Sequence, residues 1–285
     1  MSLLRVATLN IWNKSGPWLS RLPLIQQEIA RLSPEILGLQ EALRLRPPGS
    51  EHAPITAQND QATEIGERFG FHVAYAAASD YGSGLLFGNA LLSRHPILEH
   101  KAFLLPHLDS GETRSLLYAL CDTPLGRLPV FVTHLNWKFH HGLVRQAQVT
   151  FIADRIAELA PIDDALLPPV LMGDFNAEPD SDEIRYLGGR CALDGKTVYF
   201  GDAWIYGGEG PGYTFSRENG YAVKAREPSR RIDYIFVRGP DRQFRGEAMH
   251  TEVAFHAVDH SGAEPVWPSD HFGVCTDLEM VPRRF

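Results

Sequence analysis

The amino-acid sequence predicts a strand-rich α/β fold in which helices cover β-sheets. Three observations predict it. Apolar runs of about four to eight residues recur along the chain, two longer segments repeat apolar residues at helical spacing, and no linker divides the chain. Hydrophobic residues make up 44% of the 285 residues, which is enough for a large buried core. We therefore expect a single domain over residues 1–285.

The first elements form a strand–helix–strand unit. Residues 4–11 are expected as a buried strand, and Ser20 as the cap of a helix with Pro23 in its first turn. The face of that helix carries Leu22, Ile25, Ile29 and Leu32. Pro34 disfavours helix before it, and residues 36–39 follow as a second strand. A helical crossover is typical of a parallel strand pair, so we expect these two strands to be parallel.

Later segments continue the mixture of strands and helices. Residues 62–69 are expected as a helix, and a second amphipathic helix carries Val149, Ile152, Ile156 and Leu159 on one face. Further strands are expected at 71–75, 90–93, 115–122, 129–134, 170–172, 232–237 and 273–278. Glycine, proline or charge is frequent at 44–60, 78–88 and 206–229, which we expect as loops.

Charge and cysteine content limit the compartment and the kind of partner. The net charge is −8, and an acidic protein is not drawn non-specifically to polyanions, which disfavours a broad binder of duplex DNA. Cys121, Cys191 and Cys275 are widely spaced and odd in number, which excludes a disulfide framework and disfavours structural zinc. No apolar run approaches the roughly 18 residues of a membrane span or forms a signal-peptide core. We expect a cytoplasmic protein.

Polar side chains that can bind metal ions lie at the ends of six predicted strands. They are Asn10, Glu41, His134 with Asn136, Asp174 with Asn176, Asp233, and Asp270 with His271. A carboxylate against an apolar strand is costly unless it is paired or binds a cation. One such residue would be explained by a turn or a cap. Six strand ends favour a shared site, because strand ends on one edge of a sheet meet at one crevice.

The donor types indicate the chemistry of that site. Carboxylate and amide oxygens favour Mg²⁺, Mn²⁺ or Ca²⁺, whereas zinc would want more imidazole or thiolate. Mg²⁺ is usually held by one or two carboxylates, and substrate phosphate oxygens complete its shell. Histidines beside such an ion serve as general acids, bases or phosphate donors. The set therefore predicts metal-assisted hydrolysis at phosphorus.

The same residues belong to a series of short motifs. In order, these are TLN at 8–10, LQE at 39–41, GNALLSRHPI at 88–97, THLN at 133–136, GDFN at 173–176, IDYIF at 232–236 and SDHF at 269–272. The series resembles that of the endonuclease/exonuclease/phosphatase superfamily, which includes DNase I, abasic-site endonucleases, deadenylases, inositol polyphosphate 5-phosphatases and neutral sphingomyelinases. The resemblance implies a DNase I-like four-layer sandwich, with two mixed β-sheets face to face and helices outside.

The resemblance also implies a metal site. Glu41 would be the main metal carboxylate, with Asn10 and Asp270 beside the ion. The expected ion is Mg²⁺, with Mn²⁺ able to substitute. Some relatives carry an acidic residue two positions after the asparagine, where this chain has Trp12. That departure leaves a second metal in doubt.

Catalytic roles follow from the resemblance in the same way. His271 would contact the scissile phosphate and orient or deprotonate the attacking water, supported by Asp233. Asp174 would position or deprotonate that water, and Asn176 would donate to a phosphate oxygen. His134 would stabilise developing charge or protonate the leaving oxygen. Which of Asp174 and His271 takes the proton stays open.

Two more residues are candidates for binding phosphate. Arg114 precedes a predicted strand, and its guanidinium is suited to a bidentate grip on phosphate. A surface salt bridge is the alternative for Arg114. Asn136 closes the THLN motif and is the second candidate.

The loops around the site leave the substrate open. Residues 138–141 add aromatic and weakly basic character that suits stacking of a base or sugar, and a basic cluster precedes Asp233. An exposed helix start explains the first segment better than stacking does, and an ordinary solvated loop explains the basic cluster equally well. Three functions remain: a phosphoesterase acting on a small molecule or lipid head group, which the acidic charge favours, a nuclease acting on DNA or RNA, and a non-catalytic phosphate-binding module. The complete set of predicted catalytic side chains disfavours the last.

Overall fold

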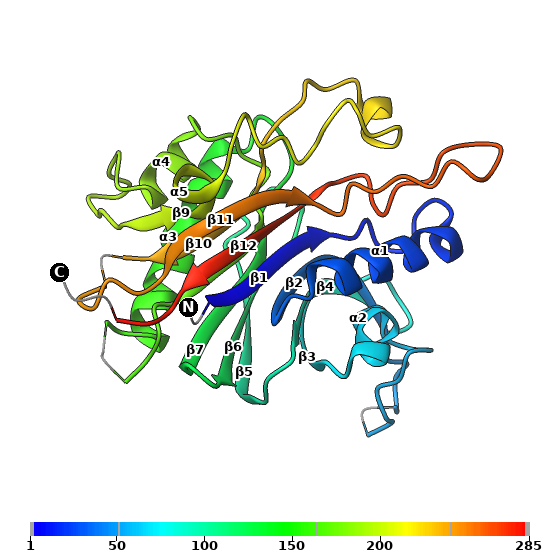
Figure 1. The fold of residues 1–285 in the computed structure, drawn as a ribbon, viewed down its shortest axis with the longest axis horizontal. Helices are drawn as coiled ribbons and strands as arrows, with labels where there is room; N and C mark the ends of the chain where they lie inside the picture. Colours follow the sequence, from blue (N-terminus) through cyan, green and yellow to red (C-terminus); the bar gives the residue numbers. More distant parts are fainter. Residues whose placement is uncertain (1–2, 51, 163–164, 240, 283–285) are drawn as a thin grey trace.

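The computed structural model describes residues 3–50, 52–162, 165–239 and 241–282 and shows two six-stranded mixed sheets face to face (Figure 1). The first sheet contains, in spatial order, β11 (Glu247–Ala254), β12 (Gly273–Glu279), β1 (Leu3–Asn10), β2 (Ile36–Leu45), β4 (Leu85–Ser93) and β3 (His72–Asp80). The second contains β5 (Ile97–Leu104), β6 (Ser115–Thr123), β7 (Gly126–His134), β8 (Val170–Asp174), β10 (Asp233–Arg238) and β9 (Phe200–Asp202).

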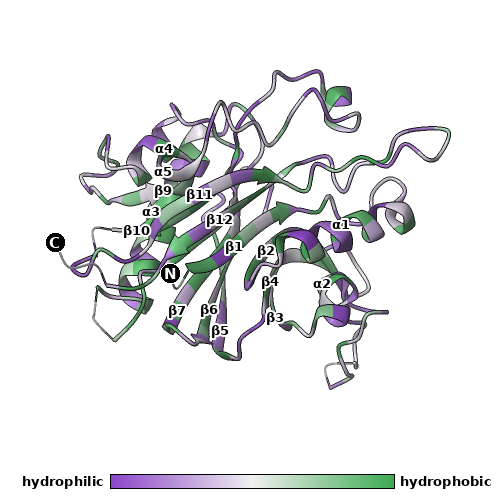
Figure 2. Cartoon of the chain, viewed as in Figure 1, coloured by the Kyte–Doolittle hydropathy of each residue, from purple (hydrophilic) through white to green (hydrophobic). Residues whose placement is uncertain are grey.

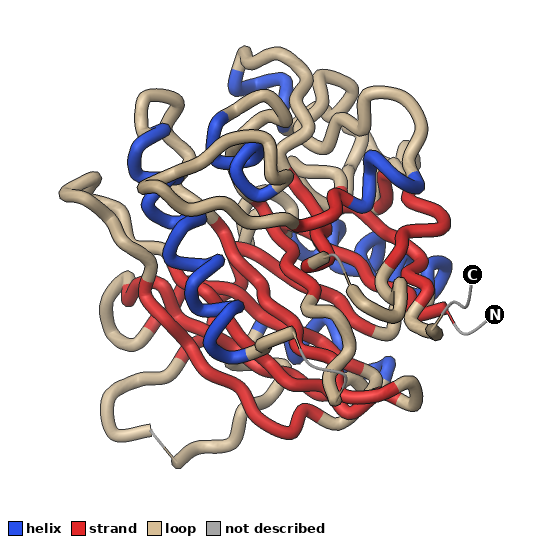
Figure 3. Tube along the Cα trace, turned by 90° about the vertical axis from the view of Figure 1, so that its left-hand side faces the viewer, coloured by secondary structure: helices blue, strands red, loops and turns tan. Residues whose placement is uncertain are grey.

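Helices cover the outer faces of both sheets (Figure 3). The first sheet carries α1 (Trp18–Leu32) and α2 (Gln61–Gly66), which continues as a 3₁₀ turn, η1 (Glu67–Phe69). The second carries α3 (Gly142–Leu159) and α4 (Asp182–Leu187). Two short helices, α5 (Ala203–Gly207) and η2 (Ala222–Ala225), lie in the later connections. The expected four-layer sandwich is confirmed.

The central strands are buried on both faces, which explains their nearly continuous apolar sequences. In β1, Val6 points between the sheets, where Val132 and Met172 of the second sheet also lie. Leu9, three positions further along β1, points outward, into the cluster that includes Ile25 of α1. Figure 2 shows the resulting hydrophobic segments of β1 and β12, broken by hydrophilic ones.

The strand directions bring the predicted site residues to one edge of the sandwich. The pair β1 and β2 is parallel, as predicted, and so is the pair β7 and β8, so each pair ends at a common edge. The strands β12, β6 and β10 run antiparallel to these neighbours and therefore begin where the neighbours end. The ends of β1, β2, β7 and β8 and the beginnings of β12, β6 and β10 therefore lie at this edge of the sandwich.

Ser20 is not the cap of the first helix, and that expectation is wrong. The helix α1 begins at Trp18, and its N-cap, Pro17, makes no side-chain capping bond. The carbonyl of Pro17 instead accepts the amides of Ser20 and Arg21, at 2.9 and 3.0 Å. Proline at this boundary closes the first turn through its backbone. The predicted end holds, because Ser33 caps the helix in the left-handed conformation.

Several strands are longer than predicted, and three, β5, β9 and β11, were not predicted at all. The strand β2 continues past Glu41 to Leu45, because a bulge absorbs the polar residues. Much of the expected 78–88 loop is strand, since β3 and β4 leave only residues 81–84 between them. The edge strands β5 and β11 lie in sequences mixing polar and apolar residues. No helix in the described ranges has both the length and the apolar character needed to cross a membrane.

Candidate functional site

A cavity of about 530 Å³ lies at the edge where the strand ends meet. The predicted site residues on its wall are Asn10, Glu41, Arg114, His134, Asp174, Asn176 and His271. Each sheet provides part of the set: Asn10 belongs to β1, whereas Asp174 belongs to β8 of the opposite sheet. The cavity therefore depends on the packing of both sheets together.

Donors from both sheets converge on the buried carboxylate of Asp174. Its Oδ2 accepts a hydrogen bond from Asn10 Nδ2 at 3.0 Å. The Nε2 atoms of His134 and His271 lie 3.4 and 3.8 Å from the same oxygen. Its Oδ1 accepts the backbone amide of Asn176 at 2.8 Å. The register supports this convergence, because β8 pairs Asp174 with His134 on one side and with Asp233 on the other.

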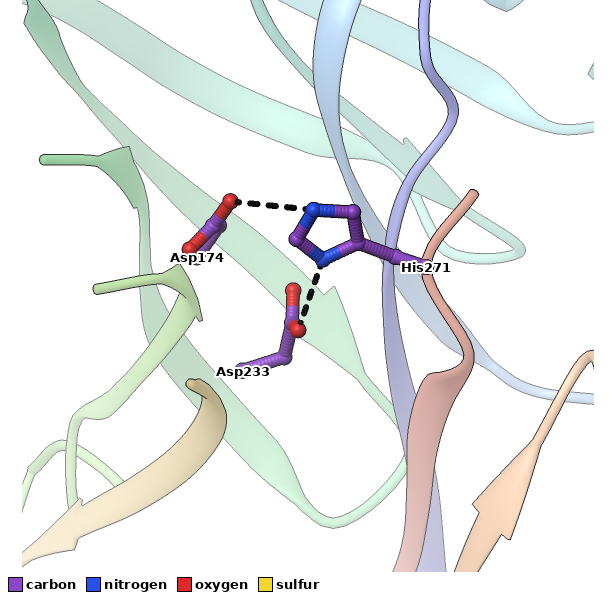
Figure 4. A group of neighbouring side chains, drawn as sticks. All are labelled: Asp174, Asp233 and His271. Carbon is purple, nitrogen blue, oxygen red and sulfur yellow. Dashed lines mark hydrogen bonds and ion pairs between the residues drawn. The ribbon is translucent and has the colours of Figure 1, made fainter. Parts of the chain in front are cut away.

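His271 is held between two carboxylates (Figure 4). Its Nδ1 lies 3.0 Å from Oδ2 of Asp233, which is buried and whose Oδ1 has no hydrogen-bond partner among the described residues. Burial alone would lower the pKa of His271, but the negative charges of Asp233 and Asp174 outweigh it and raise the pKa to about 10. At neutral pH His271 is therefore an imidazolium, and its Nε2–H faces Asp174.

His134 has the opposite protonation state. Arg114 Nη1 lies 3.0 Å from His134 Nδ1, and a guanidinium can only donate. Nδ1 must then be the unprotonated acceptor, which places the proton of the neutral ring on Nε2, facing Asp174. Burial, and after it the positive charges of Arg114 and His271, lower the pKa of His134 well below its usual range. Arg114 lies on the cavity wall and also forms an ion pair with Glu112, which occupies one edge of its guanidinium group.

Glu41 reaches the cavity through an unusual backbone conformation. It lies in the bulge of β2 with φ of +61°, a region that few non-glycine residues adopt. A bulge redirects a side chain that would otherwise alternate across the sheet. The Glu41 carboxylate accepts Asn13 Nδ2 at 3.0 Å and lies 3.5 Å from Asn10 Nδ2.

Negative charge is in excess at this edge. Burial raises the pKa of Asp270 to about 6, with Glu41 acting in the same direction and His271 and Arg21 opposing it. Burial, followed by the charge of Asp233, also raises the pKa of Asp174. Crowded, desolvated oxygen donors with raised pKa values suit a divalent cation.

Asp174, Asp233 and His271 also bring one potential ligand atom each within 4.8 Å of one another. This group could hold a metal ion. Asp233 and Asp270 are not on the cavity wall itself. Asp233 lies behind His271, and Asp270 is half-buried with its Oδ1 3.3 Å from Ser269 Oγ.

Asn136 does not line the cavity, so the structure gives its predicted phosphate contact no support. The side chain is buried, and its Oδ1 accepts Lys138 N at 3.2 Å and His141 Nδ1 at 2.9 Å. Its backbone amide donates to Gln148 Oε1 at 3.0 Å. These contacts organise the turn that follows β7.

The cavity wall also contains residues that the motifs did not identify. They are Asn13, Ser79, Tyr81, Phe87, Gly111, Glu112, Thr113, Trp137, Phe215, Glu227, Arg230 and Ile232. Arg230 lies over the rings of Phe139 and Phe215, with the guanidinium carbon 4.7 and 5.6 Å from the ring centroids. Asn13 follows the first motif by three positions, but only the turn geometry directs it toward Glu41.

Comparison with known proteins places this geometry among related folds. The sequence profile of the Endonuclease/Exonuclease/phosphatase family matches residues 7–271. Protein angel homolog 2 of Danio rerio is 25% identical over 183 residues, which cover 61% of this chain and 30% of that protein. The chain thus matches less than a third of the length of this curated relative.

Solved structures share the fold. Truncated TDP2 of Caenorhabditis elegans superposes with a TM-score of 0.69 at 19% identity, covering 97% of this chain and 98% of that one. An endonuclease/exonuclease/phosphatase of Bacteroides vulgatus superposes with a TM-score of 0.70 at 19% identity, covering 98% and 100% of the two chains. At these identities the likeness extends to the fold alone.

Proposed function

The chain belongs to the endonuclease/exonuclease/phosphatase family, and we propose that it is a divalent-metal-dependent phosphoesterase that hydrolyses a phosphodiester or phosphomonoester by in-line attack of water. One observation carries the proposal. N–H donors from Asn10, His134 and His271 converge on one side of the Asp174 carboxylate, beside Glu41. A phosphate oxygen brought there would meet the same donors.

Glu41, Asn10 and Asp270 are the proposed ligands of Mg²⁺, with Mn²⁺ as a substitute. Their oxygen donors, and the like charges of Glu41 and Asp270, fit a hard cation. When bound, the ion supplies Lewis acidity to a phosphate oxygen. The imidazole between Asp174 and Asp233 is already held as a donor to carboxylate oxygens, which favours a role for His271 toward substrate.

The side chains of the protein then have separate roles in hydrolysis. His271 donates a hydrogen bond from Nε2–H to a phosphate oxygen while Asp233 fixes the ring. His134 donates its own Nε2–H as a neutral ring and stabilises charge at the leaving oxygen. The Asp174 carboxylate orients the attacking water and accepts its proton as the new oxygen–phosphorus bond forms, since the imidazolium of His271 has no free nitrogen. Asn176 uses one amide proton on Leu135 O at 3.1 Å and has a second for a phosphate oxygen.

A small molecule or a lipid head group is the proposed substrate class. The outer cavity wall carries two arginines, Arg114 and Arg230, each paired with a glutamate. These pairs, together with the net charge of −8, give a nucleic-acid backbone no strong electrostatic attraction. Paired arginines are sufficient to grip one phosphate of a compact substrate.

Nuclease activity is the second candidate, and exposed aromatic rings favour it. Trp137 and Phe139 are 53% and 59% exposed on the loop after β7. Trp137 also lines the cavity, and exposed rings at such a position are suited to stacking with unpaired bases. This candidate predicts cleavage of single-stranded substrates.

An activity panel tests the proposal. The parent protein is assayed with Mg²⁺ or Mn²⁺ on bis-p-nitrophenyl phosphate, p-nitrophenyl phosphate, lipid phosphodiesters, short RNA and plasmid DNA. We expect hydrolysis that chelator abolishes, and a loss of about 10²–10⁴ in rate for His271→Ala. The matched control is His100→Ala, at an exposed position on the edge strand β5. Parental rates in His271→Ala would show that the assigned site is wrong, and no hydrolysis with either metal would support the non-catalytic alternative.

A further inference from the structure

Arg21 on α1 is a fully buried cation that no carboxylate contacts among the described residues. All five of its N–H groups donate to backbone carbonyls. Nε bonds Ser15 O at 3.1 Å, Nη1 bonds Ile11 O at 2.9 Å and Pro268 O at 2.8 Å, and Nη2 bonds Trp12 O at 3.3 Å and Asn13 O at 2.9 Å.

Burying this guanidinium group costs free energy of folding unless every one of its N–H donors has an acceptor. Burying a guanidinium without an ion pair costs several kcal/mol, on the order of the desolvation of one ion. Five carbonyls match the five donors of an arginine, and no other side chain offers that fork. The rings of Trp12 and Trp18 flank the group, with the guanidinium carbon 5.1 Å from each centroid. The site is therefore built for arginine.

The carbonyls that Arg21 holds belong to two segments next to the proposed metal ligands. Four come from residues 11–15, directly after Asn10, and the fifth comes from Pro268, two positions before Asp270. The first segment is strained, because Trp12 and Asn13 have φ of +53° and +39°. Strain of this kind persists only where surrounding contacts impose it.

The strained turn acts on the metal ligands through one side chain. Asn13 Nδ2 donates to Glu41 Oε2 at 3.0 Å, and its backbone carbonyl accepts both Arg21 and Gln61 Nε2, the latter at 2.8 Å. The second segment is joined to the first, because Ser269 Oγ donates to Asn10 O at 2.6 Å. Arg21 thus connects the backbone on both sides of the site.

We propose that Arg21 is a positioning residue for the metal site: it fixes the turn at residues 11–15 and the loop before Asp270, so that Asn13 holds Glu41 in place for the ion. The inference rests on the metal dependence proposed above. Arg21 contacts neither the substrate nor the ion and acts through Asn13 and the two backbone segments.

The direction in which Mg²⁺ affinity changes when Arg21 is replaced distinguishes a positioning role from a purely electrostatic one. The charge of Arg21 is close enough to Asp270 and Glu41 to be influenced by both, and it repels any divalent cation they bind. Removing the charge alone would therefore strengthen Mg²⁺ binding. Losing the geometry would weaken it, by about 10–100-fold if Arg21 behaves as outer-shell partners of metal ligands usually do.

Calorimetric titration of the purified full chain with Mg²⁺, and with Mn²⁺ as second probe, tests the proposal without an activity assay. Arg21→Lys keeps the charge but has three donors, and Arg21→Met removes both charge and donors. We expect weaker metal binding in both, and a smaller rise in Tm on adding metal. Arg238→Lys is the matched control, since this arginine also donates to a backbone carbonyl but lies at the opposite end of β10 from Asp233.

Each outcome decides the proposal. Parental affinity in both Arg21 variants, or tighter binding in Arg21→Met, overturns it. If neither variant folds, Asn13→Ala decides, because it leaves Arg21 in place and removes only the hydrogen bond to Glu41. Parental Mg²⁺ affinity in Asn13→Ala overturns the proposal, and weakened affinity supports it. A parent that binds neither metal overturns the proposed metal dependence itself, and this inference with it.

Discussion

Two histidines in one cavity have opposite protonation states because their second nitrogens meet opposite partners. Nδ1 of His271 faces a carboxylate, whereas Nδ1 of His134 faces a guanidinium. Both rings consequently present an N–H from Nε2 to the same oxygen of Asp174, one as a cation and one as a neutral donor. The pair supplies two donors while adding only one positive charge beside the proposed metal ligands.

Asp233→Asn tests this account of His271. The folded pKa of His271 is raised above its ordinary 6.5 to about 10 against the effect of burial, so its contribution to stability is full below pH 6.5 and is lost as the pH rises toward 10. Without the Asp233 charge the pKa falls, and this contribution shrinks. Urea denaturation of both proteins without metal should show a stability difference that is larger at pH 6 than at pH 10. An equal difference at both pH values would contradict the assignment.

The sequence identified the polar groups that meet around Asp174 but not the residues that orient them. Asn10, His134 and Asp174 were predicted because each ends an apolar strand with a polar side chain, a pattern visible without a structure. Asn13 and Arg21 were missed. The position of Asn13 depends on positive φ angles that no spacing indicates, and the partners of Arg21 are backbone carbonyls, which have no sequence signature.

At the scale of elements, every central strand was predicted, and the three strands that were missed, β5, β9 and β11, lie at sheet edges. The strand β7 has a buried apolar run, LPVFV, whereas β5 (ILEHKAFL) exposes most of its residues and alternates poorly. An edge strand has a neighbouring strand on one side only and tolerates charged side chains, so its composition approaches that of a loop. The predicted end of β2 was wrong for a related reason. The bulge at Glu41 lets the strand continue where the polar residues suggested an end.

Gly173 is the point where strand geometry and the site meet. Its φ is +141°, and a Cβ placed there would lie 1.9 Å from the carbonyl oxygen of Thr133 on the neighbouring strand β7. Since Asp174 follows directly, Gly173→Ala must distort β8 or push β7 away. We expect a loss of about 2–4 kcal/mol in the free energy of unfolding, measured by urea denaturation.

Gly195→Ala is the control for Gly173→Ala. Gly195 also has positive φ, +71°, but a Cβ there would meet no atom within 4 Å. Only backbone strain remains, so the expected loss is about 1 kcal/mol. Similar losses at the two positions would show that the close contact with β7 does not constrain the site.

At the scale of the molecule, the site exists only where the two sheets are packed together. The hydrogen bond from Asn10 to Asp174 and the contact of His271 with Asp233 both cross from one sheet to the other. The hydrophobic layer between the sheets therefore sets the relative position of these side chains. This arrangement explains why the motifs are spread over nearly the whole chain, from residue 8 to residue 272.

The net charge of the whole molecule predicts how KM depends on salt, and this dependence distinguishes a small phosphoester substrate from a nucleic acid. A protein that neutralises about six to ten phosphates of duplex DNA loses about 10³–10⁵ in affinity between roughly 50 and 200 mM salt, because condensed counterions are released on binding. This chain has a net charge of −8, and the two arginines on the cavity wall are each paired with a glutamate. We therefore expect KM for a small phosphodiester to change by less than about tenfold over that range, since a short substrate carries no condensed counterion layer. The measurement is the salt dependence of KM at fixed Mg²⁺, with kcat recorded to separate binding from chemistry. A steep rise of KM with salt, seen with an oligonucleotide and absent with the small ester, would instead assign the protein to nucleic acid.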